Sequence, residues 1–109
     1  MKIIKTKPYL KAAKRLGIGA QDERRLFGEL AETPEKGALI VGGGGIRKIR
    51  LALGNRGKSA GARVIYTIFE IEEELYLLDA YSKSEQANIS KAEINNLKKL
   101  IEIIRKESI

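Results

Sequence analysis

Four basic side chains fall at spacings that would gather them on one surface of a β-sheet. Residues 46–53 read IRKIRLAL, and side chains alternate along a strand, so Lys48 and Arg50 share one face about 6–7 Å apart. Arg63 opens the next strand-like run, and Lys83 follows the run after that. Strand pairing would join the four into a phosphate-binding face, although the register of the pairing cannot be obtained from the sequence.

Such a cluster needs a counter-charge, because like charges repel one another. Four glutamates could supply it, but they belong to the opposite end of the expected hairpin: Glu70, Glu72, Glu73 and Glu74. The alternative is a surface on which the cations are spread out, each beside a carboxylate. The total charge favours a phosphate-binding face, because 21 basic against 14 acidic residues leave a net charge of +7. A basic excess on a small domain indicates a polyanionic partner such as nucleic acid.

The triplet Gly57-Lys58-Ser59 resembles the end of a phosphate-binding loop of nucleotide hydrolases. That loop requires a glycine at position 52, which is alanine, and a helix after it, whereas the residues that follow read ARVIYTIFEI and predict a strand. Nucleotide hydrolysis is therefore disfavoured. We interpret residues 54–61 as a basic, glycine-rich hairpin loop, in which Arg56 and Lys58 are either functional or ordinary surface charges.

The sequence contains no cysteine and no histidine. This excludes disulfides, thiolate zinc sites, a cysteine nucleophile and every serine–histidine arrangement. Any acid–base chemistry falls to Lys, Arg, Asp, Glu or Tyr. No cofactor is expected, and no metal site is indicated without histidine or clustered Asp and Glu.

The elements that position these residues follow from the apolar periodicity. An edge strand is expected over residues 1–5, helices over about 8–16 and 21–32, and strands over 46–53, 62–71 and 75–81. Residues 37–45, GALIVGGGG, are predicted as a loop, and Ser90 with Glu93 forms a capping box that begins a final helix. The order β-α-α-β-β-β-α predicts one α+β domain over residues 1–109, with a small, mostly antiparallel sheet packed against an N-terminal helical hairpin and a C-terminal helix.

The sequence does not suggest a membrane or secreted protein. The N-terminal residues have no long apolar run, and no segment approaches the roughly 18 consecutive apolar residues of a membrane span. A cytoplasmic location is therefore expected.

Three segments carry a family resemblance by their order and spacing: GGIRKIRLA, GKSAGARVIYTIF and LYLLDAYSKSE. They resemble the RelE/ParE superfamily of toxins from type II toxin–antitoxin systems, and most of all the HigB-like branch of the RelE toxins. The resemblance covers nearly the whole chain and implies a RelE-like fold. It also implies a metal-independent endoribonuclease that cleaves mRNA on the ribosome, arrests translation and is neutralised by a cognate antitoxin. The ParE branch implies an alternative, a non-enzymatic inhibitor of DNA gyrase, and a basic RNA-binding module without activity is a third possibility.

The resemblance implies that basic residues on the sheet replace the histidine pair of ordinary ribonucleases. Lys48 and Arg50 match the basic pair of the first long strand, Arg63 matches the arginine of a G-x-R-[VIL]-x-Y segment, and Lys83 falls near the basic residue after the last strand. Because a lysine among other cations loses its proton more readily, Lys48 is our first choice as general base. Arg50 and Arg63 would stabilise the phosphorane, and Lys83 would be the acid or a second phosphate clamp.

Further RNA contacts are expected from Arg47, Arg56, Lys58 and Tyr81. Many relatives carry a tyrosine or histidine after the last strand, but residues 82–89 contain neither, so Tyr81 either assists or packs against the final helix. Glu85 is expected to be a solvated carboxylate. The implied partners are mRNA on the ribosome and an antitoxin with an acidic docking segment, which in such systems usually carries a helix-turn-helix DNA-binding domain.

Overall fold

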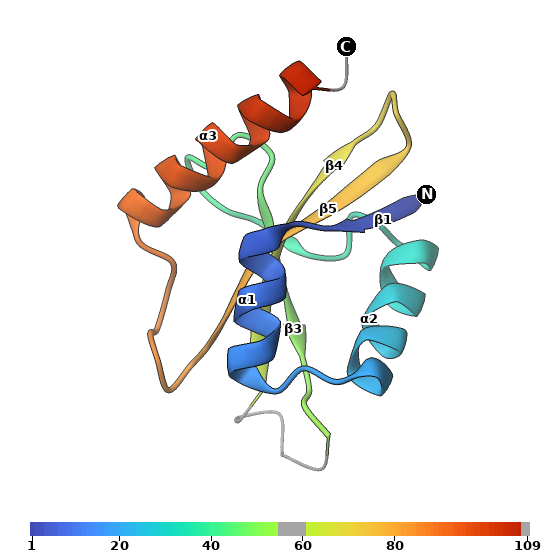
Figure 1. Cartoon of the computed structure of the whole chain (residues 1–109), viewed down its shortest axis with the longest axis vertical. Helices are drawn as coiled ribbons and strands as arrows, with labels where there is room; N and C mark the ends of the chain where they lie inside the picture. The colour runs from blue at the N-terminus through green and yellow to red at the C-terminus, as the bar shows by residue number, and fades with distance from the viewer. Residues whose placement is uncertain (55–60, 108–109) are drawn as a thin grey trace.

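The structure is a computed structural model that describes residues 1–54 and 61–107. Within these residues the elements are β1 (Lys2–Lys5), α1 (Lys7–Leu16), α2 (Ala20–Glu32), β2 (Ala38–Leu39), β3 (Arg47–Leu51), β4 (Ala62–Phe69), β5 (Glu74–Ser82) and α3 (Lys91–Glu107). Figure 1 shows their arrangement. The predicted α+β class is confirmed, and one short strand, β2, is added to the expected order.

The strands form a single mixed sheet in the order β1-β5-β4-β3-β2. Strand β1 runs parallel to β5, and every other pairing is antiparallel. Helices α1 and α2 pack on one face of the sheet and α3 on the other (Figure 1). The sheet is therefore the central layer, between the helical hairpin on one face and α3 on the other.

The larger core lies between the helical hairpin and the sheet. Tyr9 and Ala12 of α1 and Leu26 and Leu30 of α2 are almost completely buried there. The sheet contributes mainly aliphatic side chains to the same cluster: Ile49, Leu51, Val64, Leu75 and Leu77. This is the apolar stripe that alternation along residues 46–53 predicts, so β3 presents one apolar face to the hairpin.

The second core lies under α3 and covers only part of the other face. Leu97 and Ile101 of α3 are buried against the sheet, as their helical spacing predicts. Their partners are Ile46, Ile65, Phe69, Tyr76, Leu78 and Tyr81. Lys48, Arg50 and Arg63 are on this face but do not belong to the cluster, and they remain partly or largely exposed.

Local signals define the ends of the helices. The side chain of Thr6 accepts a hydrogen bond from the Tyr9 N–H at the start of α1. Helix α3 begins with the predicted capping box, because the Ser90 hydroxyl accepts from the Glu93 N–H at 3.1 Å and the Glu93 carboxylate accepts from the Ser90 N–H at 3.0 Å. These contacts fix where the chain enters α1 and α3.

Strand β2 lies within the residues predicted as a loop. Ala38 pairs with Lys48 and Leu39 with Arg47, and both β2 residues are exposed. A two-residue strand without a buried position has no periodicity to reveal it, which explains the difference from the prediction. The glycine run follows, and Gly42 and Gly44 have φ values of 75° and 65°, a backbone conformation that glycine adopts readily.

Strand β5 contains one extra residue relative to β4. Ile65 pairs with Asp79 and Tyr66 with Leu77, so Leu78 is left without an opposite residue. Before this bulge the side chain of Tyr76 lies under α3, and after it that of Tyr81 does, although five positions separate them. The bulge therefore keeps Tyr81 on the same face as Lys48, Arg50 and Arg63.

Candidate functional site

The register joins the predicted residues into one row across three strands. Arg50 of β3 is opposite Arg63 of β4, and Arg63 is opposite Tyr81 of β5. Lys48 is two residues before Arg50 and therefore on the same face. These residues and Lys83 line an open hollow of about 320 Å³, together with Ala38, Ala87 and Asn88. The structure thus brings Lys48, Arg50, Arg63 and Lys83 to one place.

The hollow begins where the cover of α3 ends. Ile65, opposite Lys48, is completely buried in the α3 cluster, whereas Lys48 is half-buried and Arg50 is exposed. Ala87 and Asn88, from the segment that leads into α3, form one wall. The same face of the sheet is therefore apolar under α3 and cationic beside it.

Among the described residues, none of the four cations has a carboxylate partner. Within residues 1–54 and 61–107, the ion pairs are Lys5–Glu23, Arg15–Glu85, Arg25–Asp22 and Lys36–Glu29. None involves Lys48, Arg50, Arg63 or Lys83. A group of cations without nearby acids has a positive potential that attracts phosphate.

The acidic hairpin turn is far from this cluster. Glu74 pairs with Phe69 at one end of the β4–β5 hairpin, whereas Arg63 pairs with Tyr81 near the other end. Arg63 and Phe69 are six positions apart along β4, which corresponds to roughly 20 Å. This confirms the expectation that the glutamates lie at the opposite end of the hairpin and do not neutralise the cations.

A second hollow continues the cationic surface around the edge of the sheet. Strand β2 pairs with only the first two residues of β3, so the rest of that edge is uncovered. A hollow of about 500 Å³ lies there, lined by the cations Lys36, Lys48, Arg50 and Arg63 and by one acid, Glu29, which is paired with Lys36. The basic surface therefore extends along β3 beyond the central hollow.

Tyr81 forms part of the floor of the central hollow. Its side chain is only 4% exposed and packs in the cluster under α3. Burial raises the pKa of its phenol, while the charge of Arg63 and the backbone N–H of Ile89 act in the opposite direction. Tyr81 is therefore a protonated hydroxyl at neutral pH, and its ring is held by protein contacts on the side of α3.

Arg47 lies away from the cluster. Its place in β3 puts it on the face opposite that of Lys48, and its guanidinium donates to the carbonyl oxygens of Glu35 at 3.1 Å and Gly37 at 2.8 Å. Arg47 thus ties the segment after α2 to the sheet, and the structure does not bring it to the hollow. Arg56 and Lys58 lie outside the described residues.

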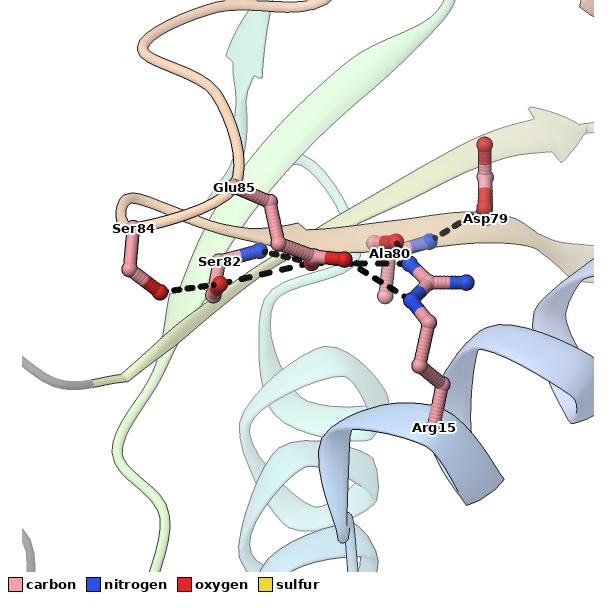
Figure 2. Close-up of polar contacts among 6 residues, drawn as sticks. All are labelled: Arg15, Asp79, Ala80, Ser82, Ser84 and Glu85. Atoms are coloured by element: carbon pink, nitrogen blue, oxygen red, sulfur yellow. Dashed lines mark hydrogen bonds and ion pairs between the residues drawn. The ribbon is translucent and has the colours of Figure 1, made fainter.

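The turn that carries Lys83 is held by a contact that the sequence does not reveal. Figure 2 shows Glu85 between Arg15 of α1 and Ser82 at the end of β5. The hydrogen bond from Arg15, followed by that from the Ser82 N–H, lowers the pKa of Glu85. Glu85 is thus an ionised, paired carboxylate instead of the solvated one expected. Arg15 is 70 residues away in the chain, so no local pattern could indicate it.

The described part of the chain lacks two further features. No group of three or more His, Cys, Asp or Glu side chains is placed to hold a metal ion there. Nor is any helix in residues 1–54 and 61–107 both long and apolar enough to cross a membrane.

Comparison with known proteins agrees with the fold. The structure of a mutant of the E. coli toxin RelE in the free state is similar to this chain, with a TM-score of 0.53 and 18% sequence identity. The similarity covers 79% of this chain and 86% of that one. A family model described as the RelE toxin of the RelE/RelB toxin–antitoxin system matches residues 1–108. An antitoxin is thus the expected partner, and this chain belongs to the RelE family of toxins.

Proposed function

We propose that this protein is a ribosome-dependent mRNA endonuclease that arrests translation. The observation that carries the proposal is the convergence of Lys48, Arg50, Arg63 and Lys83 on one hollow without a carboxylate partner among the described residues. Membership of a toxin family supports it, because cleavage of mRNA would make such a surface toxic. A single-stranded segment of mRNA would enter along the cationic face.

The reaction is the attack of a ribose 2′-hydroxyl on the adjacent phosphate. A base removes the proton from the 2′-hydroxyl, whose oxygen forms a new bond to phosphorus. The bond from phosphorus to the 5′ oxygen breaks, and an acid supplies the proton that this leaving oxygen needs. The products are a 2′,3′-cyclic phosphate and a free 5′-hydroxyl, and the phosphorane between them has extra negative charge that cations stabilise.

The geometry supports a proposed role for each cation. Lys48 would be the general base, because it is the half-buried lysine at the boundary with the α3 cluster and lines the hollow beside Arg50 and Arg63. Arg50 and Arg63 are adjacent on β3 and β4 and would grip the phosphorane with guanidinium forks. Lys83, from the turn after β5, approaches the same hollow and would supply the proton or clamp the phosphate.

The remaining contacts of the RNA would come from the border of the hollow. Asn88 offers an amide that can hydrogen-bond a base, and Tyr81 forms part of the floor. Arg56 and Lys58 of the connecting loop remain proposed phosphate contacts. We leave Arg47 out of this set, because its guanidinium is bound to two carbonyl groups on the other side of the sheet.

The proposed substrate also specifies the partners and the location. Translating ribosomes place the reaction in the cytoplasm. The cognate antitoxin would present an acidic segment to the basic face, and we infer that it also carries a helix-turn-helix domain that binds the operator DNA. Within the family, the three resembling segments favour the HigB-like branch.

The proposal is tested with purified protein, ribosomes and a translated mRNA. Primer extension should show cuts at codon positions that require the ribosome, and the double substitution Lys48→Met with Arg63→Met should slow cutting by at least about 100-fold. Lys11→Met is the matched control, because Lys11 is an exposed cation of α1 outside the hollow. Unchanged cutting by the double variant would reject the site, and inhibition of DNA gyrase supercoiling without mRNA cleavage would reject the activity.

A further inference from the structure

The turn between β5 and α3 is anchored to the first helix of the chain. In this turn the N–H groups of Glu85 and Gln86 both donate to the Ser82 carbonyl, at 3.1 and 3.2 Å. The Glu85 carboxylate bends back and accepts from the Ser82 N–H at 2.9 Å and from the Ser82 hydroxyl at 3.3 Å. Lys83 therefore lies in the turn between Ser82 and Glu85, which are hydrogen-bonded to each other.

Arg15 near the end of α1 holds this turn from outside (Figure 2). Its Nε donates to Oε2 of Glu85 at 2.8 Å, and its Nη2 donates to the Ala80 carbonyl of β5 at 3.2 Å. A planar guanidinium that binds both the turn and the strand before it fixes the angle between them. Helix α1 is itself rigidly placed, because Tyr9 and Ala12 are buried in the larger core.

The turn that Arg15 holds also contributes Lys83 to the proposed site. Lys83 lines the central hollow with Arg63, and it also lines a separate hollow of about 570 Å³ that is bordered by Arg15 and Glu85. Among the described residues, Lys83 has no ion pair that would fix its own side chain. The position of its ammonium group thus depends on the backbone of the turn.

We propose that Arg15, acting through Glu85, is a positioning residue that holds Lys83 against the scissile phosphate. This inference rests on the proposed function, and it adds two residues that do not line the central hollow. Removing either one would break the contact between the turn and α1, and removing Glu85 would also break the bonds from its carboxylate to Ser82. Lys83 would then sample positions outside the hollow, and a small displacement of a reacting group slows catalysis strongly.

The charge that each substitution removes distinguishes a positioning role of Arg15 from a direct contact of Arg15 with RNA. If Arg15 acted only as one more cation for the RNA backbone, Glu85→Ala would leave cleavage unchanged or improve it, because it removes a negative charge near the hollow. A positioning role requires the opposite, since Glu85 connects Arg15 to Ser82. Arg15→Ala and Glu85→Ala should therefore both slow the reaction, although they change the net charge in opposite directions.

The test is a double-mutant cycle on the single-turnover cleavage rate. Arg15→Ala and Glu85→Ala should each slow cleavage by about 10-fold, and neither should slow it further in a Lys83→Ala background. Arg15→Lys keeps one charged contact to Glu85 and should recover most of the rate. The affinity for a non-cleavable 2′-deoxy RNA analogue should change less than about 2-fold in Arg15→Ala, because a positioning role affects the reaction and not the binding.

Lys11→Ala, an exposed cation of the same helix, is the control and should leave the rate unchanged. Arg15 is 53% exposed, so these variants should fold, and circular dichroism verifies this. Equal slowing by Arg15→Ala with and without Lys83 would overturn the inference, as would full activity of either single variant. Absence of cleavage by the wild-type protein would instead reject the proposed function, and the two failures are therefore distinguishable.

Discussion

Arg50 and Arg63 lie directly opposite each other on adjacent antiparallel strands. Directly opposed residues have Cβ atoms about 4.5–5.5 Å apart, and like charges in such a pair destabilise a sheet. A folded chain would gain nothing from this arrangement by itself. Under the proposed function, the two guanidinium groups are needed side by side, at some expense of stability.

Replacing Arg50 should separate stability from activity. Arg50→Thr removes the repulsion and introduces a residue suited to a strand, so we expect the free energy of unfolding to rise by about 0.5 kcal/mol. Cleavage should fall by about 10- to 100-fold, because one stabiliser of the phosphorane is lost. Urea denaturation and primer extension measure the two quantities.

The control for this substitution is Lys2→Thr on β1. Lys2 is an exposed strand cation, but it is opposite Glu74, so its loss removes an attraction. Stability should stay the same or decrease slightly, and cleavage should not change. A decrease in stability for Arg50→Thr would contradict the interpretation of the arginine pair.

Binding of single-stranded RNA should depend steeply on salt through the cationic face. The logarithm of the affinity for a non-cleavable oligonucleotide falls with the logarithm of salt concentration by about 0.7 for each phosphate neutralised. We expect Lys48→Met and Arg63→Met each to reduce this slope by about 0.7. Lys106→Met, at the far end of α3, should leave the slope unchanged. Fluorescence anisotropy measured at salt concentrations from about 50 to 300 mM gives these slopes.

Asp22 should make the stability of the fold depend on pH in the acidic range. Its buried carboxylate accepts from the N–H groups of Gly19 at 2.9 Å and Gly54 at 3.0 Å, and it pairs with Arg25. The bonds to Gly19 and Gly54 lower its pKa, against the effect of burial. Because the folded-state pKa is below the unfolded value, the stabilisation is present above about pH 4 and is lost as the pH falls through the folded-state pKa.

Asp22→Asn should therefore destabilise the protein by about 1–3 kcal/mol at pH 7 and by clearly less at pH 3. Guanidinium denaturation at the two pH values measures the difference. An equal loss of stability at both pH values would show that the negative charge of Asp22 does not contribute to the stability of the fold.

In contrast to Asp22, the ionised carboxylate of Asp79 should lower the stability of the fold at neutral pH. It is half-buried beside the bulge, and burial raises its pKa, with a further increase from Glu93, while the hydrogen bond from the Ala80 N–H lowers it. A raised folded-state pKa means that the group contributes stability below its unfolded pKa and loses that contribution as the pH rises. The wild-type protein thus bears a penalty at pH 7, where the carboxylate is charged.

Asp79→Asn keeps an oxygen that can accept from Ala80 and removes the charge. We expect a higher denaturation midpoint than that of the wild type at pH 7 and equal midpoints near pH 3. Lower stability of the variant at pH 7 would mean that the charge of Asp79 is used in the folded state.

Local patterns were sufficient for the parts of the site that lie within single strands. Alternation places Lys48 and Arg50 together, and the same rule puts Arg47 on the other face, where the structure has it, although an RNA contact was expected from it. The capping box of Ser90 and Glu93 also depends only on near neighbours. Such features need no knowledge of how the strands pair.

Other features depend on pairing across long stretches of chain. The register that sets Arg63 between Arg50 and Tyr81 results from the packing of both cores and from the bulge at Leu78. The contact between Arg15 and Glu85 joins residues at opposite ends of the chain. Strand β2 has no buried residue from which a period could be recognised. None of these has a signature that a short window of sequence contains.

The unpaired residue in β5 has a practical consequence for aligning or redesigning this chain. Counting by twos from Tyr76 arrives at Leu78 and Ala80 and assigns Tyr81 to the hairpin side, which is the wrong side of the sheet. An alignment that treats β5 as a regular strand without the bulge would assign the side chains after Leu78, including Tyr81 at the hollow, to the wrong face of the sheet. Conversely, a deletion at Leu78 would restore the regular ladder, shorten the apolar patch beneath α3 and leave the orientation of the downstream side chains unchanged.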